Sequence, residues 1–201
     1  MRHGQADNNV SRILVGRHAE AHLTEQGKEQ VAHAAKNLKG IPISKVYVSP
    51  VTRAVETAKI VCDTLGMAYE VDERLYEIEL GKLVGMNYED VTSKYGDLFM
   101  RFYSESDPVL AGFGVENFSS VKRRVKSFLD DAVLLHKDSN ILTITHLDPI
   151  KAALASILDL KPEALYRWHI RNASLTILKH ESRVYSLSGV NVMAIHRYPD
   201  E

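Results

Sequence analysis

Two apolar runs, each followed closely by a helix-start signal, constrain the fold most strongly. Lys45–Ser49 (KVYVS) leads into Pro50, and Ile141–Thr145 (ILTIT) is followed shortly by Asp148 and Pro149. A short run of apolar and β-branched residues predicts a buried strand, and Ser or Asp before Pro predicts a helix N-terminus. Strands that alternate with helices in this way are typical of an α/β fold with a largely parallel sheet.

The rest of the chain continues this alternation. A helix capped by Thr24 is expected to run to Leu38, and the helix after Pro50 is expected to run to Leu65. Further expected elements are strands over 68–71, 173–179 and 183–187, helical pieces over 87–103 broken near 96, helices over 117–136 and from 149 to about 158, and loops over 72–85 and 108–114. Because we find no internal repeat, low-complexity segment or linker, we expect one domain over residues 1–201.

Charge and composition exclude several classes of protein. The 25 Lys and Arg nearly balance the 26 Asp and Glu, so we expect no positive electrostatic field that would attract nucleic acid or a membrane surface. We interpret the basic run Lys122–Arg124 as a solvated helix face. No apolar stretch approaches the roughly 20 residues that span a bilayer. The single Cys62 cannot form an intrachain disulfide, which fits a reducing compartment, and we expect a cytoplasmic protein.

Polar residues follow both of the clearest strands. In open α/β sheets, ligands bind beyond the carboxyl ends of the strands, so Thr145 and His146 after ILTIT should face the same crevice as Arg53 after KVYVS. A histidine and an arginine that converge there predict an anion site, above all one for phosphate.

A series of short motifs, in order along nearly the whole chain, resembles the histidine phosphatase superfamily, which includes the cofactor-dependent phosphoglycerate mutases. Each motif is weak alone, whereas the ordered set is specific. The motifs are Arg2-His3-Gly4 with Asn9 and Gly16, Leu23-Thr24 with Gly27 and Gln30, Ser49-Pro50 with Arg53 and Thr57, Leu75-Tyr76-Glu77 ahead of Gly81 and Gly85, Gly114-Val115-Glu116-Asn117, Thr145-His146, and Arg171-Asn172-Ala173-Ser174.

This resemblance implies a fold and a set of site residues. The fold would be a three-layer α/β/α sandwich with a mostly parallel central sheet, like that of phosphoglycerate mutase, with a helical cap insertion at roughly 84–114. The partner would be a small-molecule phosphate ester, with no metal and no nucleic acid or membrane partner; a homodimer is left open. The implied catalytic residues are His3, Glu77 and His146, and the implied phosphate-binding residues are Arg2, Asn9, Arg53 and Leu147.

The implied mechanism passes through a phosphohistidine. The neutral imidazole of His3 would attack phosphorus while Arg2 and Arg53 hold the phosphoryl oxygens and His146 adds a donor. Glu77 would protonate the leaving oxygen and then activate the acceptor water.

A second Arg-His pair, Arg17-His18, competes with Arg2-His3 for the role of nucleophile. His3 lies 20 residues before Leu23, whereas His18 lies only 5 residues before it, too close to the following helix. His3 is also followed by a glycine, whose missing side chain would let the backbone approach a phosphate, and His18 is not. The spacing therefore favours His3.

The sequence also departs from the family pattern at two positions. Leu147 follows His146 where relatives usually have a glycine, and this replacement would make the approach of the backbone to the phosphate tighter. Val84 stands where relatives often have a glutamate. Neither departure removes a core group.

The reaction depends on the acceptor of the phosphoryl group. If water accepts the phosphoryl group, the enzyme is a phosphatase and needs no cofactor. If a hydroxyl of a bound bisphosphate accepts it, the enzyme is a mutase that uses 2,3-bisphosphoglycerate. The mutases of the family have a longer segment between the glutamate and the second histidine than the 69 residues found here, so we favour a phosphatase and keep the mutase as the alternative. Two other readings stay open: a non-catalytic module for phosphorylated ligands, and a metallohydrolase with His18 and His22 as ligands.

The start of the chain carries one more expectation. The family places its Arg-His-Gly after a strand, yet only Met1 precedes Arg2. We expect Met1–His3 to lie inside the sheet beside ILTIT, and the natural chain to begin several residues upstream.

Overall fold

A parallel sheet of three strands forms the centre of the computed structural model, which describes residues 1–104 and 107–193. The strands lie in the order β2 (Glu70–Val71), β1 (Ile43–Val48) and β3 (Asn140–Ile144), and both pairings are parallel. A separate antiparallel pair consists of β4 (Leu175–Glu181) and β5 (Val184–Val192). The predicted alternation of strands and helices around a largely parallel sheet is confirmed.

The N-terminal segment lies between these two sheets. The Thr145 amide donates to the carbonyl oxygen of Met1 at 2.9 Å, and the His3 amide donates to the carbonyl oxygen of Thr145 at 3.0 Å. On the other side, the Arg2 amide donates to Ser174 at 3.1 Å, just before β4 begins. The expectation that Met1–His3 lies beside ILTIT is confirmed, and this placement brings His3 to the end of β3.

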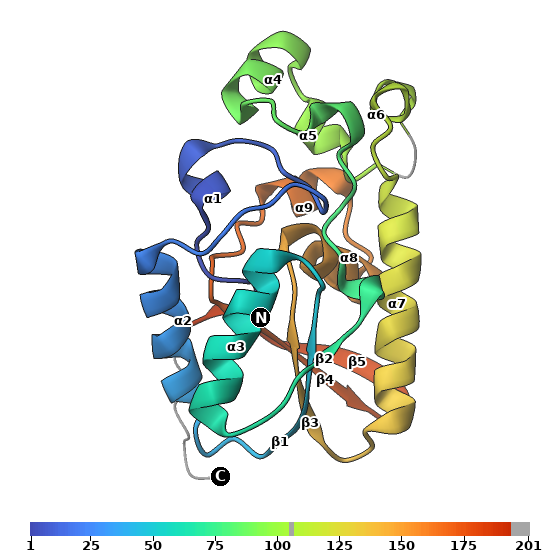
Figure 1. Ribbon diagram of the computed structural model, residues 1–201. Helices are drawn as coiled ribbons and strands as arrows, with labels where there is room; N and C mark the ends of the chain where they lie inside the picture. Colours follow the sequence, from blue (N-terminus) through green and yellow to red (C-terminus); the bar gives the residue numbers. More distant parts are fainter. Residues whose placement is uncertain (105–106, 194–201) are drawn as a thin grey trace.

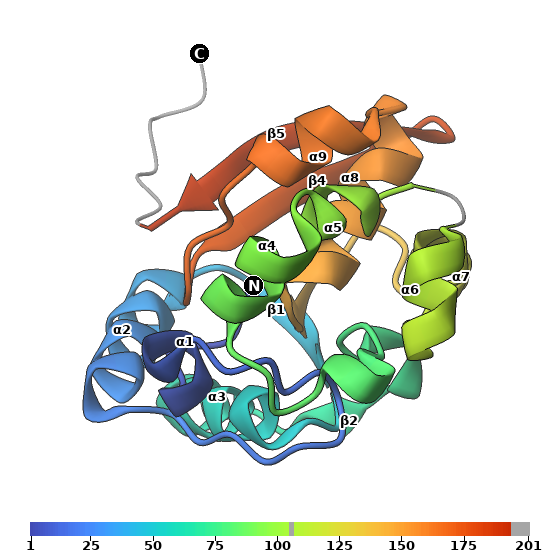
Figure 2. The same ribbon diagram turned by 90° about the horizontal axis from the view of Figure 1, so that it is seen from above.

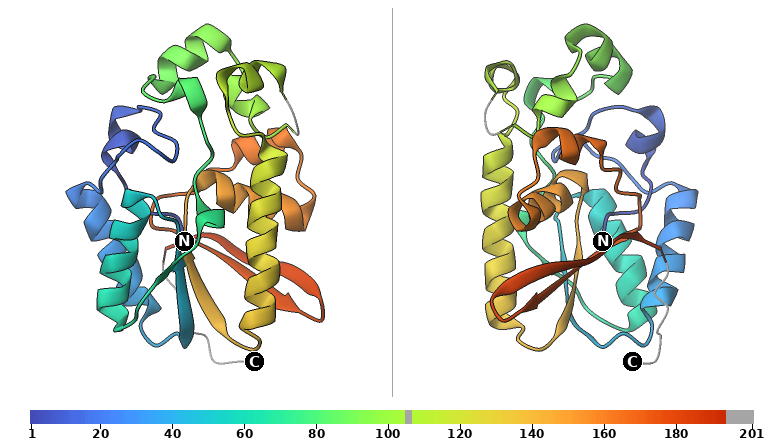
Figure 3. Two further views of the ribbon diagram at one scale, coloured as in Figure 1. Left: turned by 45° about the vertical axis from the view of Figure 1, so that its right-hand side comes forward. Right: turned by 180° about the vertical axis from the view of Figure 1, so that it is seen from behind.

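Helices cover both faces of the parallel sheet. On one face, α2 (Glu25–Leu38) and α3 (Thr52–Leu65) pack on Val46 and Val48; on the other, α7 (Phe118–Leu135) packs on Tyr47 through Phe128. Tyr47 contacts the opposite helix layer because successive strand residues point to opposite faces. α8 (Leu147–Leu158) packs beside α7, and Figures 1 and 3 show the resulting three layers.

Short helices lie above the carboxyl ends of the strands. These are α4 (Tyr88–Tyr95), α5 (Leu98–Arg101) and α6 (Pro108–Phe113), and Figure 2 shows α4 and α5 across the middle of the molecule, over β1. They share an apolar core with α7 and α8, in which Tyr88 stacks on Phe99 with a centroid distance of 4.3 Å. The remaining elements are α1 (Asp7–Ser11), η1 (Glu73–Leu75), η2 (Gly81–Leu83) and α9 (Pro162–Arg167).

Several predicted elements differ from the structure. The helix predicted from 149 begins at Leu147, and the strand predicted over 183–187 continues to Val192. The segment 108–114, predicted as a loop, forms α6, because Asp107 caps it, Pro108 occupies its first turn and Gly114 ends it in the left-handed region. The helix predicted to begin at Pro50 begins at Thr52, without a side-chain cap from Val51. Among the described residues, no helix is long and apolar enough to cross a membrane.

Candidate active site

Four buried side chains meet beyond the carboxyl ends of β1 and β3. His3 and His146 face each other with ring centroids 5.1 Å apart, and Ser49 and Arg53 come from the turn and first helical turn after β1. Arg53 donates from Nε to His3 Nε2 at 3.2 Å and from Nη2 to the carbonyl oxygen of Gly16 at 3.0 Å. The convergence predicted from the two strand ends is therefore present.

The hydrogen bonds of His3 define its tautomer. Its Nδ1 lies 2.7 Å from the carbonyl oxygen of Gly4, which can only accept, so the proton is on Nδ1. Nε2 is then an unprotonated nitrogen that receives the Arg53 N–H. Burial, followed by the charges of Arg53 and Arg2, lowers the pKa of His3 well below its ordinary 6.5. The ring is thus a neutral imidazole with Nε2 available as a nucleophile.

His146 is held in a complementary way. Its Nε2 lies 2.8 Å from the Ser49 hydroxyl. Burial, and next the charge of Arg53, lowers the pKa of His146 well below 6.5, so the ring is neutral. When the Ser49 hydroxyl donates to Nε2, the ring proton lies on Nδ1, which is then a donor without a partner among the described residues.

Three buried nitrogens in this region make no hydrogen bond to any part of the chain that the structure describes. They are Arg2 Nε, Arg53 Nη1 and His146 Nδ1. Buried donors without partners are rare and costly, about 1–3 kcal/mol each. An anion with several oxygens, such as a phosphoryl group, would satisfy donors of this kind, since two of the three nitrogens belong to guanidinium groups.

Glu77 reaches the site from the loop between η1 and η2. Its carboxylate oxygen Oε1 accepts from the amide of Ile78 at 3.0 Å and from the amide of Asp148, in the first turn of α8, at 3.3 Å. Burial, followed by the nearby Asp148 carboxylate, raises the pKa of Glu77 from 4.5 to about 7, against the opposing charges of Arg53 and Arg2. Glu77 can therefore give and take a proton near neutral pH.

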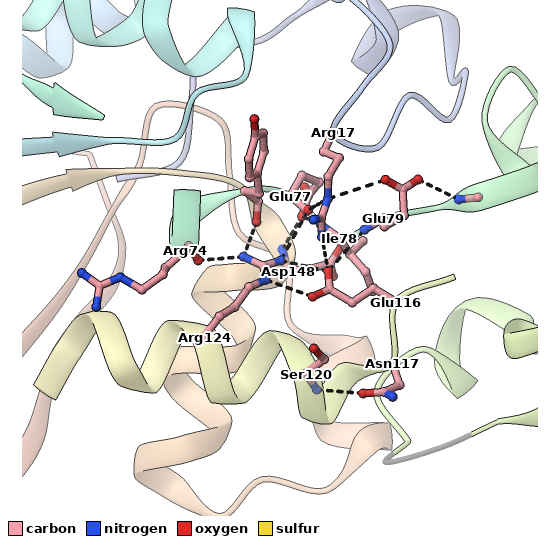
Figure 4. A network of polar contacts seen from close by, with 12 residues as sticks. Arg17, Arg74, Glu77, Ile78, Glu79, Glu116, Asn117, Ser120, Arg124 and Asp148 are labelled. Carbon is pink, nitrogen blue, oxygen red and sulfur yellow. Dashed lines mark hydrogen bonds and ion pairs between the residues drawn. The ribbon is translucent and has the colours of Figure 1, made fainter. Parts of the chain in front are cut away.

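The backbone around Glu77 is held by two arginines and a glutamate (Figure 4). Arg17 donates from Nε to the carbonyl oxygen of Glu77 at 3.1 Å, and Arg124 donates to the carbonyl oxygen of Tyr76 at 2.6 Å. Glu116 pairs with both arginines and lies 3.0 Å from Arg124 Nε. The interpretation of Lys122–Arg124 as a solvated face is wrong for Arg124, whose side chain is only 16% exposed.

Asn9 and Leu147 lie next to the site in different ways. The Asn9 side-chain oxygen accepts from the amide of Ala6 at 3.0 Å and from Asn172, which also donates to the carbonyl oxygen of His3 at 3.1 Å. Leu147 is the first residue of α8, where the helix itself offers its N–H no acceptor.

Gly4 has a packing role that the sequence did not indicate. A Cβ atom at Gly4 would lie 2.6 Å from Val31 Cγ2 and 2.7 Å from the carbonyl oxygen of Gly27. The glycine after His3 therefore lets this segment lie directly against α2.

His18 and His22 bond to different carboxylates. His18 Nε2 lies 2.8 Å from Glu79 and its side chain is 72% exposed, whereas His22 Nδ1 lies 2.7 Å from Glu56. In residues 1–104 and 107–193, no group of three or more His, Cys, Asp or Glu side chains is arranged to hold a metal ion. The two histidines thus do not form the shared ligand pair that a metallohydrolase would need.

Comparison with known proteins identifies the family. A model described as the histidine phosphatase superfamily (branch 1) matches residues 1–193. The chain belongs to this superfamily. A 2,3-bisphosphoglycerate-dependent phosphoglycerate mutase of Thermoplasma acidophilum is 34% identical over 96% of this chain and 92% of its own length. A putative phosphoserine phosphatase 2 of Hydrogenobacter thermophilus is 29% identical over 95% and 93%.

A solved structure supports the same assignment of fold. The mycobacterial glucosyl-3-phosphoglycerate phosphatase, solved with VO3, is 26% identical, has a TM-score of 0.83, and is matched over 95% of this chain and 96% of its own. The resemblance and the α/β/α fold inferred from the motifs are confirmed. The relatives named above are phosphatases and a phosphoglycerate mutase, so the chain, as a member of this superfamily, is an enzyme of phosphoryl transfer.

Proposed function

We propose that this protein is a phosphohydrolase that cleaves phosphate monoesters of small metabolites through a phosphohistidine on His3. The observation that carries the proposal is the neutral, buried His3, whose unprotonated Nε2 lies among donors on Arg2, Arg53 and His146 that have no partner in the described chain. A nucleophilic nitrogen amid such donors suits in-line attack on phosphorus, where charge develops on the phosphoryl oxygens.

In the first step, the lone pair of His3 Nε2 forms a bond to phosphorus and the bond from phosphorus to the ester oxygen breaks. Glu77, protonated below a pKa of about 7, gives its proton to the departing oxygen. In the second step, water attacks phosphorus, Glu77 takes the water proton, and the N–P bond breaks. Each step leaves Glu77 in the protonation state that the next one requires.

The phosphate-binding roles of Arg2, Asn9, Arg53 and Leu147 belong to the same proposal. Arg2 and Arg53 supply charge, and the N–H of Leu147 at the start of α8 adds a neutral donor. Asn9 is tied through Asn172 to the backbone of His3, which suits a group that fixes the nucleophile's segment.

A second candidate function is the 2,3-bisphosphoglycerate-dependent phosphoglycerate mutase. The relative that favours it is the Thermoplasma protein, 34% identical, which this chain matches over 92% of that protein's length. A mutase of nearly the same size weakens the argument that a short segment between Glu77 and His146 indicates a phosphatase. The phosphatase remains our proposal, because phosphoserine phosphatases at 29% and 27% identity and the glucosyl-3-phosphoglycerate phosphatase support a water acceptor.

A panel of phosphate esters tests the two functions. Phosphoserine, 3-phosphoglycerate, glycerol phosphate and nitrophenyl phosphate are assayed for release of inorganic phosphate, and 3-phosphoglycerate is assayed separately for isomerisation with 2,3-bisphosphoglycerate present. We expect phosphate release from at least one metabolite ester. Isomerisation faster than phosphate release would assign the mutase, and no transfer from any ester would contradict both.

Three broader expectations complete the proposal. We propose one domain over residues 1–201, with the segment 84–114 as a cap that selects the leaving group. The single Cys62, buried in the core, fits a reducing cytoplasm. Homodimerisation would be tested by light scattering of the purified protein.

A further inference from the structure

Three hydrogen-bonded side chains join the cap to Asp148, whose backbone amide in turn bonds to Glu77. Lys151 Nζ donates to the Tyr103 hydroxyl at 3.0 Å, and this hydroxyl donates to Asp148 Oδ1 at 3.0 Å. The amide of Asp148 then donates to Glu77 Oε1 at 3.3 Å. Asp148 and Lys151 lie on α8, whereas Tyr103 follows α5 in the cap, so two parts of the fold contribute to one hydrogen-bonded relay.

The direction of each bond follows from the chemistry of the groups. An ammonium group can only donate, so the Tyr103 oxygen accepts from Lys151 and its own proton must point to Asp148. The ring of Tyr103 is fixed as well, because it packs edge-on against Phe118 at 5.2 Å and lies under the Lys151 ammonium at 4.5 Å. Tyr103 and Lys151 are both buried. The Asp148 carboxylate is consequently held in one place, on the residue whose own amide donates to the proposed acid Glu77 at 3.3 Å.

The groups around Glu77 show why this placement matters. The charge of Asp148 raises the pKa of the Glu77 carboxyl group, whereas the charges of Arg53 and Arg2 lower it. The other titratable or charged groups of the region are neutral or have partners. His3 and His146 are neutral. Arg17 and Arg124 both donate to backbone carbonyl groups and pair with Glu116. Glu79 pairs with Arg17 and His18, and Lys151 donates to Tyr103.

We propose that Asp148 is a positioning residue of the reaction: Tyr103 and Lys151 hold its carboxylate toward Glu77, and this second carboxylate keeps the proton on Glu77 until the leaving group takes it. The inference rests on the proposed function, in which Glu77 is the acid. It also links the cap to the chemistry, since Tyr103 lies in the cap segment and donates to Asp148.

The balance of charges agrees with this arrangement. Two carboxyl groups in one site cannot both ionise easily, so one of them retains its proton to higher pH. Burial and then Asp148 raise the pKa of Glu77 to about 7, while burial and then Asp148 raise that of Tyr103 well above its ordinary value, so Tyr103 remains a donor. Lys151 keeps its charge below a pKa lowered by burial to about 8.

The first test compares Asp148→Asn with Asp159→Asn, the same change at the exposed C-terminal end of the same helix. The pH dependence of kcat/KM is measured with glycerol phosphate and with nitrophenyl phosphate. We expect Asp148→Asn to move the alkaline limb for glycerol phosphate to lower pH by about one unit, because Glu77 loses its proton earlier. The limb for nitrophenyl phosphate, whose leaving group needs no acid, should stay, and Asp159→Asn should change neither.

The second test does not depend on turnover. With carboxyl-labelled glutamate, the ¹³C titration of Glu77 is assigned by its loss in Glu77→Gln, and we expect a midpoint near 7 in the wild type. Asp148→Asn should lower that midpoint by about one unit, and Tyr103→Phe should lower it by less, since it frees the carboxylate without removing it. An unchanged midpoint in Asp148→Asn would overturn the positioning role even if the enzyme hydrolyses esters. No hydrolysis by the wild type would contradict only the proposed function, and the midpoint would still decide the role of Asp148.

Discussion

Replacing Glu77 with Gln should stabilise the protein at neutral and alkaline pH while it abolishes acid catalysis. The pKa of Glu77 is about 7 in the folded protein and 4.5 is its ordinary value, a difference of roughly 2.5 units, or about 3 kcal/mol at 1.36 kcal/mol per unit. Gln preserves the shape of the side chain and an oxygen that can accept from Ile78 and Asp148. The change removes the buried charge and leaves the hydrogen bonds.

The pH dependence has a definite sign. Because the folded-state pKa is raised, the contribution of Glu77 to stability is fully present below about pH 4.5 and is lost as the pH rises through 7. The Gln variant has no such loss. The difference in unfolding free energy, variant minus wild type, should therefore grow by about 2–3 kcal/mol between pH 5 and pH 8. The low pKa values of His3 and His146 weaken both proteins below about pH 6.5, and this effect cancels in the difference.

Urea unfolding of the two proteins at pH 5, 6, 7 and 8 measures this difference, with Glu29→Gln on the exposed face of α2 as the control. The difference in unfolding free energy between this control and the wild type should not change with pH. Activity provides the second half of the test. Glu77→Gln should slow the hydrolysis of glycerol phosphate far more than that of nitrophenyl phosphate, because only the alkyl oxygen needs a proton to leave. A difference in unfolding free energy between variant and wild type that is the same at all four pH values would refute the reasoning. Equal slowing of the hydrolysis of the two esters would refute it as well.

Four further changes have distinct expected outcomes. His3→Ala should abolish turnover and the acid-labile phosphoryl label on the protein, whereas His18→Ala should keep both within a few fold; the reverse pattern would reassign the nucleophile. Gly4→Ala should cost about 1–3 kcal/mol in urea unfolding, because its Cβ would meet atoms of α2 at 2.6 and 2.7 Å. Ser49→Ala should lower kcat roughly tenfold or more by freeing the His146 ring, with KM less affected. EDTA should leave hydrolysis unchanged, since Arg2 and Arg53 supply the positive charge; loss restored by zinc would contradict the histidine mechanism.

The centre of the site was predictable because its residues are fixed by local structure. Arg53 lies in the first helical turn after β1, and His146 is the second residue after β3. The carboxyl ends of parallel strands meet at one edge of a sheet, so strand position alone places these side chains together. His3 was placed by the resemblance instead, since the family has its Arg-His-Gly at the end of a strand, and Met1–His3 does pair with Thr145 after β3.

The support around Glu77 could not be predicted in this way. Arg17 and Glu116 are 99 positions apart in the sequence, and Tyr103 and Lys151 are 48 apart, with helices and at least one strand between the members of each pair. Neither a helical nor a strand period relates them, so no pattern in the sequence signals the contact. Arg124 shows the consequence: in sequence it belongs to a basic run on a surface helix, yet its side chain turns inward to the carbonyl groups around Tyr76.

Two misread helix starts show where local rules fail for a physical reason. Ser49 and Asp148 were both interpreted as helix caps, because each precedes a proline after a strand. In the structure neither residue is the N-cap of its helix: the Ser49 hydroxyl bonds to His146 at 2.8 Å and accepts only a long bond from the Val51 amide at 3.4 Å, and the Asp148 carboxylate accepts from Tyr103. A hydroxyl or carboxylate makes only a few hydrogen bonds, and here the short ones are made with groups of the site and not with the amides of the helix ends. Departures from local preference are expected where function competes with folding, so the two failed caps themselves point to the site.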